Sequence, residues 1–317
     1  MPSTKAIKQR IKSVKNTRQI TKAMEVVSAT KMRKSQGFAL DGRPYALAAL
    51  EMLGNITART DYRPVLLQER PVNRALVVVV TSDKGLAGAF NANVLRRAEK
   101  IVGERESEYP VDVVTVGKKA REYFGSRSEN VVKEFLGFGD FVDPRETNPL
   151  SDFMLAGFAH GRWDAADMVY TNFRSTLKQE VRVARVFPVD LERVRETIRN
   201  IIPEHGRFAA LGGASPDLGS SHGVDARERY TYEYTCEPSS QAILDALIPH
   251  LLGMQIFHMI LESNASEHSA RMVAMKNASE NAADIITELT LQYNKQRQAA
   301  ITKELTEITA GKEALEG

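Results

Sequence analysis

Residues 244–300 decide the fold, and they read LDALIPHLLGMQIFHMILESNASEHSARMVAMKNASENAADIITELTLQYNKQRQAA. From Leu244, steps of three and four residues alternate without a register break over eight heptads and end at Ala300. Twelve of the seventeen positions in this series are Leu, Ile, Met or Ala, the pattern of a left-handed coiled-coil seam. The segment therefore predicts one long helix that needs a partner helix. Pro249 either kinks its first turns or marks its start.

A second apolar series at helical spacing lies near the N-terminus, with one step of six residues in it: Ile7, Ile11, Val14, Ile20, Met24 and Val27. A step of six where seven would keep the register predicts a seam that is locally overwound between Val14 and Ile20. No proline interrupts residues 3–43, so a long helix is expected there as well. Because the intervening chain leaves and returns at one end, we expect the two terminal helices to form one antiparallel coiled coil.

Charge is distributed unevenly along the chain. Residues 1–36 carry a net charge of +9, residues 239–317 carry −4, and the whole chain carries +3. Opposite signs favour contact between the two terminal segments, although each exposed ion pair contributes only about 0–1 kcal/mol. The composition of the basic segment is equally typical of a solvated helix face or of an arm that binds nucleic acid.

Between the terminal helices the apolar pattern becomes that of an α/β domain. Strands are predicted at 75–81, 111–116, 167–173 and 180–187, with helices at 89–102, 118–124 and 150–160. Such alternation favours a mostly parallel sheet covered by helices. A Gly-, Ser- and Pro-rich stretch at 203–228 predicts a mobile loop, and 230–235 a last strand. The predicted domains are an N-terminal coiled-coil helix (1–60), an α/β domain (70–235) and a C-terminal coiled-coil helix (239–317).

No motif in the sequence predicts catalysis or a cofactor. The turn TSDKGLAGAFN at 81–91 follows a strand, as phosphate-binding loops do, but the spacing of Gly85 and Gly88 fits neither nucleotide fingerprint. A tight turn with Asp83 near a helix cap explains it better, so the domain is interpreted as Rossmann-like without a cofactor. The triad residue types at 266–268 are helix neighbours that point in different directions. The isolated chain is therefore not expected to be an enzyme.

Other features restrict the location of the protein. The longest purely apolar run has six residues, too few to span a bilayer, so no transmembrane segment is expected. The single cysteine, Cys236, cannot form an internal disulfide, which favours a reducing compartment. The N-terminal residues have no apolar region typical of a secretory signal.

Three blocks of sequence, at 7–33, 81–91 and 266–307, together resemble the gamma subunit of the F-type ATP synthase. In that family the terminal helices form an asymmetric rotor shaft inside a ring of three alpha and three beta subunits. The α/β domain forms a foot that binds the epsilon subunit and rests on the c-ring. The resemblance thus implies a central rotor stalk that couples ion flow to ATP synthesis or hydrolysis, without a cofactor or catalytic residues of its own.

The resemblance also implies partner-binding residues. Those expected to contact the alpha and beta subunits are Lys22, Met24, Lys31, Arg33, Lys34, Arg297, Gln298 and Thr302. Those expected to contact the c-ring are Tyr234 and Glu237, the latter preceding Pro238. Each of these side chains is equally explained as an ordinary exposed helix or loop residue.

With no transit peptide before the first block, the resemblance implies a bacterial protein, peripheral to the cytoplasmic face of the plasma membrane. Two alternatives from other classes stay open at this point. One is a nucleotide-dependent enzyme built on the α/β domain, and the other is a nucleic-acid-binding coiled coil that uses the basic segment, although the resemblance implies no nucleic-acid partner.

Overall fold

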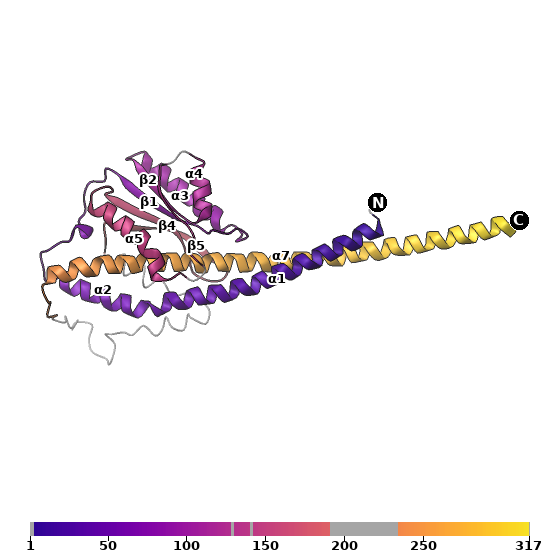
Figure 1. The fold of residues 1–317 in the computed structure, drawn as a ribbon, viewed down its shortest axis with the longest axis horizontal. Coiled ribbons are helices and arrows are strands. Elements are labelled where there is room, and N and C mark those ends of the chain that lie inside the picture. Colours follow the sequence, from indigo (N-terminus) through magenta and orange to yellow (C-terminus); the bar gives the residue numbers. More distant parts are fainter. Residues whose placement is uncertain (1–2, 128–129, 140–141, 191–233, 317) are drawn as a thin grey trace. The chain divides into compact units, whose positions relative to one another are not determined.

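The computed structural model describes residues 3–127, 130–139, 142–190 and 234–316. The predicted loop at 203–228 and most of the strand expected at 230–235 lie outside the described residues. The chain divides into two compact units, one made of residues 1–28 and 271–317 and the other of residues 29–270. The terminal helices α1 (Thr4–Asp41) and α7 (Ser240–Glu316) contribute residues to both units (Figure 1).

The larger unit contains one five-stranded sheet, in the order β3-β2-β1-β4-β5. Strands β1 to β4 are parallel, and β5 pairs with β4 in the antiparallel direction. The mostly parallel sheet predicted from the sequence is therefore confirmed. The strands are β1 (Ala75–Val80), β2 (Val111–Val116), β3 (Val131–Phe135), β4 (Ala165–Phe173) and β5 (Gln179–Phe187).

Each face of this sheet is covered by its own hydrophobic core. Because successive strand residues point to opposite faces, Val77 and Val79 of β1 join one core and Val78 and Val80 the other. The first core also holds residues of α3 (Phe90–Glu106) and α4 (Lys118–Gly125). The second holds residues of α5 (Pro144–Ala159), α2 (Arg43–Thr57) and α7. Burial on both faces explains why β1 is an unbroken apolar run.

The glycine-bearing turn after β1 is held in place by hydrogen bonds to its surroundings. The carboxylate of Asp83 accepts from the backbone N–H of Lys118 at 2.9 Å and from that of Gly137 at 3.1 Å. Asn91 hydrogen-bonds the backbone and hydroxyl of Ser82. Asp83 thus caps the start of α4, a helix distant in sequence, and the turn joins the ends of three strands.

Asp112 of β2 organises the opposite end of the sheet. Its carboxylate is fully buried and accepts from Trp163 Nε1 at 2.8 Å, from Asn130 Nδ2 at 2.6 Å and from Arg74 Nη1 at 3.1 Å. Arg162 lies 3.8 Å from the same carboxylate. This carboxylate therefore holds together segments that precede β1, β3 and β4.

Asp112→Ala is expected to lower the free energy of unfolding by about 2–3 kcal/mol, because the buried indole N–H would lose its acceptor. Urea denaturation at neutral pH measures the change. Asp112→Asn keeps an acceptor for Trp163 and should cost less. Equal losses for the two variants would show that the indole bond is not the main contribution.

In the larger unit, the N-terminal helices run antiparallel to α7. Met32 shares a small core with Ala265, Gly42 packs against the ring of His258, and Tyr45 makes an edge-to-face contact with His250. Later residues of α1 and α2 therefore contact earlier residues of α7, so the N-terminal helices and α7 run in opposite directions. The predicted antiparallel pairing is confirmed, but the N-terminal helix is divided, since α1 ends at Asp41 and α2 begins at Arg43.

Helix α7 begins at Ser240, and Pro249 lies inside it. The expectation that Pro249 could mark the start of the helix is therefore wrong. Within the described residues, α7 is the one helix long and apolar enough to cross a membrane by length and composition, with an apolar window of mean hydropathy 1.5. Half of that window is buried inside the structure, as in core helices of soluble proteins, so the absence of a transmembrane segment stays a prediction.

In the smaller unit, the seam of α7 lies where the heptad pattern predicts it, as far as Gln296. After Arg271, which is buried one residue before the predicted seam position Met272, the buried positions are Met275, Ser279, Ala282 and Leu289, spaced by four, three and seven residues. Beyond Gln296, every residue from 297 to 310 is exposed. The heptad pattern thus predicts the paired part of the helix, whereas its last position, Ala300, is exposed.

The seam predicted on α1 is wrong after Val14. Ile20 and Val27 are 60% and 51% exposed, whereas Thr21 and Ser28 are buried. The step of six residues is therefore not an overwound seam. The helix keeps its regular heptad register from Ile7 onwards, and small polar side chains occupy the buried positions where large apolar ones were expected.

Candidate partner-binding surface

An exposed apolar surface lies on the part of α1 in the smaller unit. Ile20, Val26 and Val27 are all more than half exposed, although the seam beside them buries only Thr21 and Ser28. Apolar side chains on the outside and polar ones inside reverse the usual amphipathic arrangement. We name Ile20, Val26 and Val27 the α1 stripe. A large exposed apolar patch on a soluble protein is typical of a surface that binds another protein.

The unpaired end of α7 carries a second such surface. Ile301, Leu305 and Ile308 are exposed and recur at spacings of four and three, so they lie on one face of the helix. We name these three residues the α7 stripe. An exposed single helix with an apolar face is typical of a segment that inserts into a groove or socket of a partner.

The predicted contact residues of α1 lie on the exposed parts of that helix or beside them. Lys22 is exposed and forms an ion pair of 3.0 Å with Glu25, one turn further along. Met24 is half-buried between the seam and the α1 stripe. Arg33 and Lys34 are exposed and Lys31 is half-buried, all three in the larger unit.

The predicted contact residues of α7 lie where the helix loses its partner. Arg297, Gln298 and Thr302 are exposed, and the Thr302 hydroxyl donates to the Gln298 carbonyl at 3.0 Å. Met24, by contrast, belongs to the paired part of the smaller unit. The predicted contact residues of α7 and Met24 of α1 therefore do not form one site but are distributed along the two helices.

The two residues predicted to contact the c-ring lie directly before α7. Tyr234 is half-buried and packs against the core that α7 shares with the sheet. Glu237 is exposed and precedes Pro238. Glu237 is thus the more accessible of the two side chains.

The described residues do not contain a metal-binding group of three or more His, Cys, Asp or Glu. In the turn after β1, the carboxylate of Asp83 occupies the N-terminus of α4, a position that would otherwise attract an anion. Leu86 projects from the same turn, 65% exposed and with a φ of 62°. The turn therefore braces the sheet and presents an apolar side chain.

Sequence reasoning misses both apolar stripes. Ile20 and Val27 fit a predicted seam because they are apolar and nearly in register. A signal is nevertheless present, since α1 has more large apolar residues than one seam can bury. The α7 stripe also recurs at steps of four and three, but its residues lie one or two positions beyond those of the continued seam, so it faces another direction.

Comparison with known proteins agrees with this architecture. A family model described as ATP synthase matches residues 3–315. The chain is 42% identical to the ATP synthase gamma chain of Roseiflexus castenholzii and 37% identical to that of Chlorobaculum parvum, covering 99% of both chains in each case.

Solved structures share the fold at lower sequence identity. A chain from the rotational-state structure of the Euglena gracilis mitochondrial ATP synthase, comprising OSCP, F1 and c-ring, matches with a TM-score of 0.61 and 18% identity, over 98% of this chain and 94% of that one. A chain from the central stalk and c-ring structure of the Tetrahymena thermophila enzyme matches with a TM-score of 0.56 and 19% identity, over 82% and 99%.

The fold thus combines two long terminal helices with a Rossmann-like domain that lies between them in the sequence. With relatives this similar along the whole length, the chain belongs to the family of ATP synthase gamma chains.

Proposed function

We propose that this chain is the central rotor stalk of a bacterial F-type ATP synthase and is itself non-catalytic. Its partners would be the alpha and beta subunits around the terminal helices, and the epsilon subunit and c-ring at the α/β domain. The complex would lie at the cytoplasmic face of the plasma membrane. The predicted domain boundaries at 1–60, 70–235 and 239–317 belong to this proposal.

The observation that supports the rotor function most is the unequal surface of the terminal helices. In the smaller unit, α1 presents the α1 stripe, whereas α7 presents Ile285 and Leu291 and then the α7 stripe. Three equivalent neighbours around such a pair would each meet a different surface. Differential contact energy would then hold each neighbour in a different conformation, and rotation would exchange those conformations.

The predicted contact residues fit this mechanism in two groups. Lys22 and Met24, with Lys31, Arg33 and Lys34, would meet acidic and apolar groups of a beta subunit along α1. Arg297, Gln298 and Thr302 would hydrogen-bond a beta-subunit loop beyond the paired part of α7. Tyr234 and Glu237 would form the contact with the c-ring.

Co-expression with the alpha and beta subunits of the same organism tests the proposal. We expect steady ATPase activity only when this chain is present, and we expect the chain to purify with the other two subunits. Equal activity with and without the chain would contradict the rotor function.

The double variant Arg297→Ala, Thr302→Ala is expected to bind the alpha and beta subunits at least tenfold more weakly, a loss of about 1.4 kcal/mol or more, because Arg is often a dominant contact at interfaces. Affinity measurements with purified subunits test this. The matched control is Lys303→Ala, Thr306→Ala, which likewise removes one exposed basic side chain and one exposed threonine from the same helix. Equal effects of the two double variants would remove Arg297 and Thr302 from the site.

A further inference from the structure

A buried carboxyl–amide pair joins α7 to the sheet. Glu262 of α7 is 5% exposed and Asn172 of β4 is 1% exposed. The Asn172 Nδ2 group donates to Glu262 Oε2 at 2.8 Å. The other end of the same amide, Asn172 Oδ1, is buried without a hydrogen-bond partner. The pair therefore makes one hydrogen bond, and the buried acceptor Asn172 Oδ1 lacks a donor.

A protonated carboxyl group on Glu262 would supply the missing donor. A carboxylate can only accept, whereas a carboxylic acid has one O–H that can donate. With Oε2 accepting from Nδ2, an O–H on Oε1 would donate to Oδ1 and close a ring of two hydrogen bonds. Burial also raises the pKa of Glu262 to about 8, against the smaller lowering effects of Asn172, Arg182 and Arg174.

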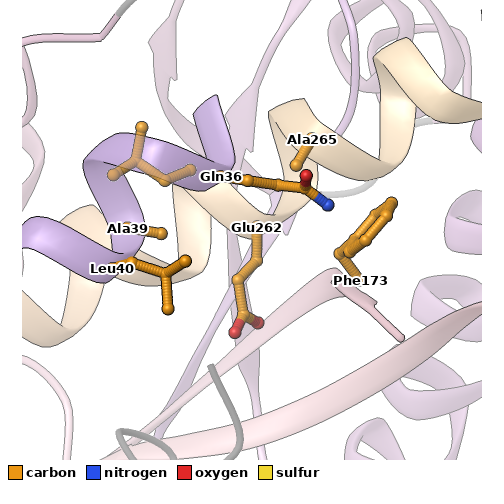
Figure 2. Close-up of a pocket in the computed structure, with 7 residues that line it drawn as sticks. Gln36, Ala39, Leu40, Phe173, Glu262 and Ala265 are labelled. Carbon is orange, nitrogen blue, oxygen red and sulfur yellow. The ribbon is translucent and has the colours of Figure 1, made fainter. Parts of the chain in front are cut away.

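The groups that favour the charged form of Glu262 are outweighed by its burial, and they act from the sheet side and not from α1. From α1, the side chains that line the adjoining cavity are Gln36, Ala39 and Leu40, none of which titrates. Figure 2 shows the carboxyl group of Glu262 directed away from the Gln36 amide. The titratable groups that act on Glu262 come from β4 and β5: Tyr170, Arg174, just beyond the end of β4, and Arg182.

The same face of α7 makes three more polar contacts with the β4–β5 hairpin, one of which is the bond that Gln179 Nε2 donates to the Ser269 hydroxyl at 3.3 Å. The Ser266 hydroxyl donates to the Thr171 carbonyl at 3.3 Å, and the Ser269 hydroxyl donates to the Thr176 carbonyl at 2.8 Å. Residues 262, 266 and 269 are one and two turns apart, so they lie on one face of the helix. Because these directional bonds are aligned, a rotation of α7 about its axis would break all of them.

We propose that Glu262 is held protonated, forms a two-hydrogen-bond pair with Asn172, and with Ser266 and Ser269 fixes the rotational position of α7 on the sheet. Glu262 is then a positioning residue for torque transfer between the α/β domain and the long helix. The protonated pair rests on the buried hydrogen bond from Asn172 and on its unpartnered Oδ1, independently of the proposed rotor function. The role in torque transfer rests on the proposed rotor function.

The first test is the pH dependence of stability of the full chain and of Glu262→Gln. Glutamine can make the same two hydrogen bonds but does not titrate. Since the folded pKa of Glu262 exceeds its unfolded value of about 4.3, the folded state holds the proton more tightly, and rising pH destabilises the wild type. Relative to Glu262→Gln, its unfolding equilibrium constant should rise about tenfold per pH unit between pH 5 and pH 8. Above pH 8 the difference should stay constant.

Glu280→Gln is the matched control, because Glu280 is an exposed carboxylate on the same helix. It should not produce this pH-dependent difference. Infrared spectroscopy of the full chain at pH 6 should show a protonated carboxyl band that Glu262→Gln removes and Glu280→Gln retains. A stability difference independent of pH from 5 to 9, or the absence of that band, would overturn the protonated pair.

The second test uses the assembled complex and compares Glu262→Ala with Glu262→Gln. We expect Glu262→Ala to reduce proton pumping per ATP hydrolysed at least twofold, and we expect Glu262→Gln to restore the wild-type ratio. A wild-type ratio in Glu262→Ala would overturn the positioning role. Failure of the unmodified chain to support any ATP-driven pumping would instead contradict the proposed function, and the pH and infrared results would still decide the pair.

Discussion

The variant Gly157→Ala is expected to lower the free energy of unfolding by about 3 kcal/mol, the upper end of the usual range for overpacking. A Cβ atom at Gly157 of α5 would lie 1.7 Å from Cζ3 of Trp163. The indole cannot move aside easily, because it is buried and its Nε1 is hydrogen-bonded to Asp112. Urea denaturation followed by fluorescence measures the loss directly, since Trp163 is the only tryptophan in the sequence.

Gly103→Ala is the control for this prediction. Gly103 lies inside α3, and a Cβ atom there would meet nothing within 4 Å. Alanine is preferred over glycine in helices by about 1 kcal/mol, so this variant should be slightly more stable than the wild type. If Gly157→Ala were as stable as Gly103→Ala, the close packing of α5 on Trp163 would be contradicted.

A loss of about 3 kcal/mol or more is likewise expected for Gly117→Ala, where backbone strain adds to overpacking. Gly117 follows β2 with a φ of +90°, where a side chain is strained. A Cβ atom there would also lie 2.2 Å from the backbone carbonyl oxygen of Thr81, in the turn after β1. This contact lies where the neighbouring strands β1 and β2 end. The collision could be relieved only if the C-terminal ends of these two strands moved apart. Thermal and urea unfolding both report the change.

Gly137→Ala is the control that separates the cost of backbone strain at a positive φ from the cost of the steric clash with Thr81. Gly137 has a φ of +77°, but a Cβ atom there would meet nothing within 4 Å. Its replacement should therefore cost only the strain of a positive φ, about 1 kcal/mol. Similar losses for Gly117→Ala and Gly137→Ala would show that the contact with Thr81 contributes little.

The sequence predicts most of the fold because its signals are long and regular. The heptad series from Leu244 specifies α7 over many turns, and the buried β1 is an unmistakable apolar run. Strand β3, in contrast, reads VVKEF, and its five residues are exposed or half-buried at the edge of the sheet. A short edge strand of this kind has no clear alternation, so periodicity cannot identify it.

The break between α1 and α2 escapes prediction for a different reason. Apolar residues continue at helical spacing through residues 40–50. The only sign of a helix boundary in the sequence is the Gly-Arg-Pro segment at 42–44. Pro44 cannot donate to the carbonyl of Leu40, so the helix loses one bond there. Gly42 also allows His258 to approach, since a Cβ atom would lie 3.1 Å from its ring.

The candidate site is predictable only in part. Family resemblance implies that Arg297, Gln298 and Thr302 are contact residues, which stays a prediction, and the structure adds that they lie where the exposed end of α7 begins. The α1 stripe depends on which side of the helix faces α7. Thr21 and Ser28 lie on the buried side and Ile20 and Val27 on the exposed side, so hydrophobicity alone does not reveal which side is buried.

Direct observation of rotation tests the central claim most directly. A probe is attached through Ser107→Cys, in a Cys236→Ser background, to the exposed end of α3, and the complex with alpha and beta subunits is fixed to a surface by the beta subunits. With ATP, the account predicts rotation of the probe in one direction, with three pauses per turn for three catalytic subunits. Steady ATP hydrolysis by the complex while the probe stays fixed would contradict it.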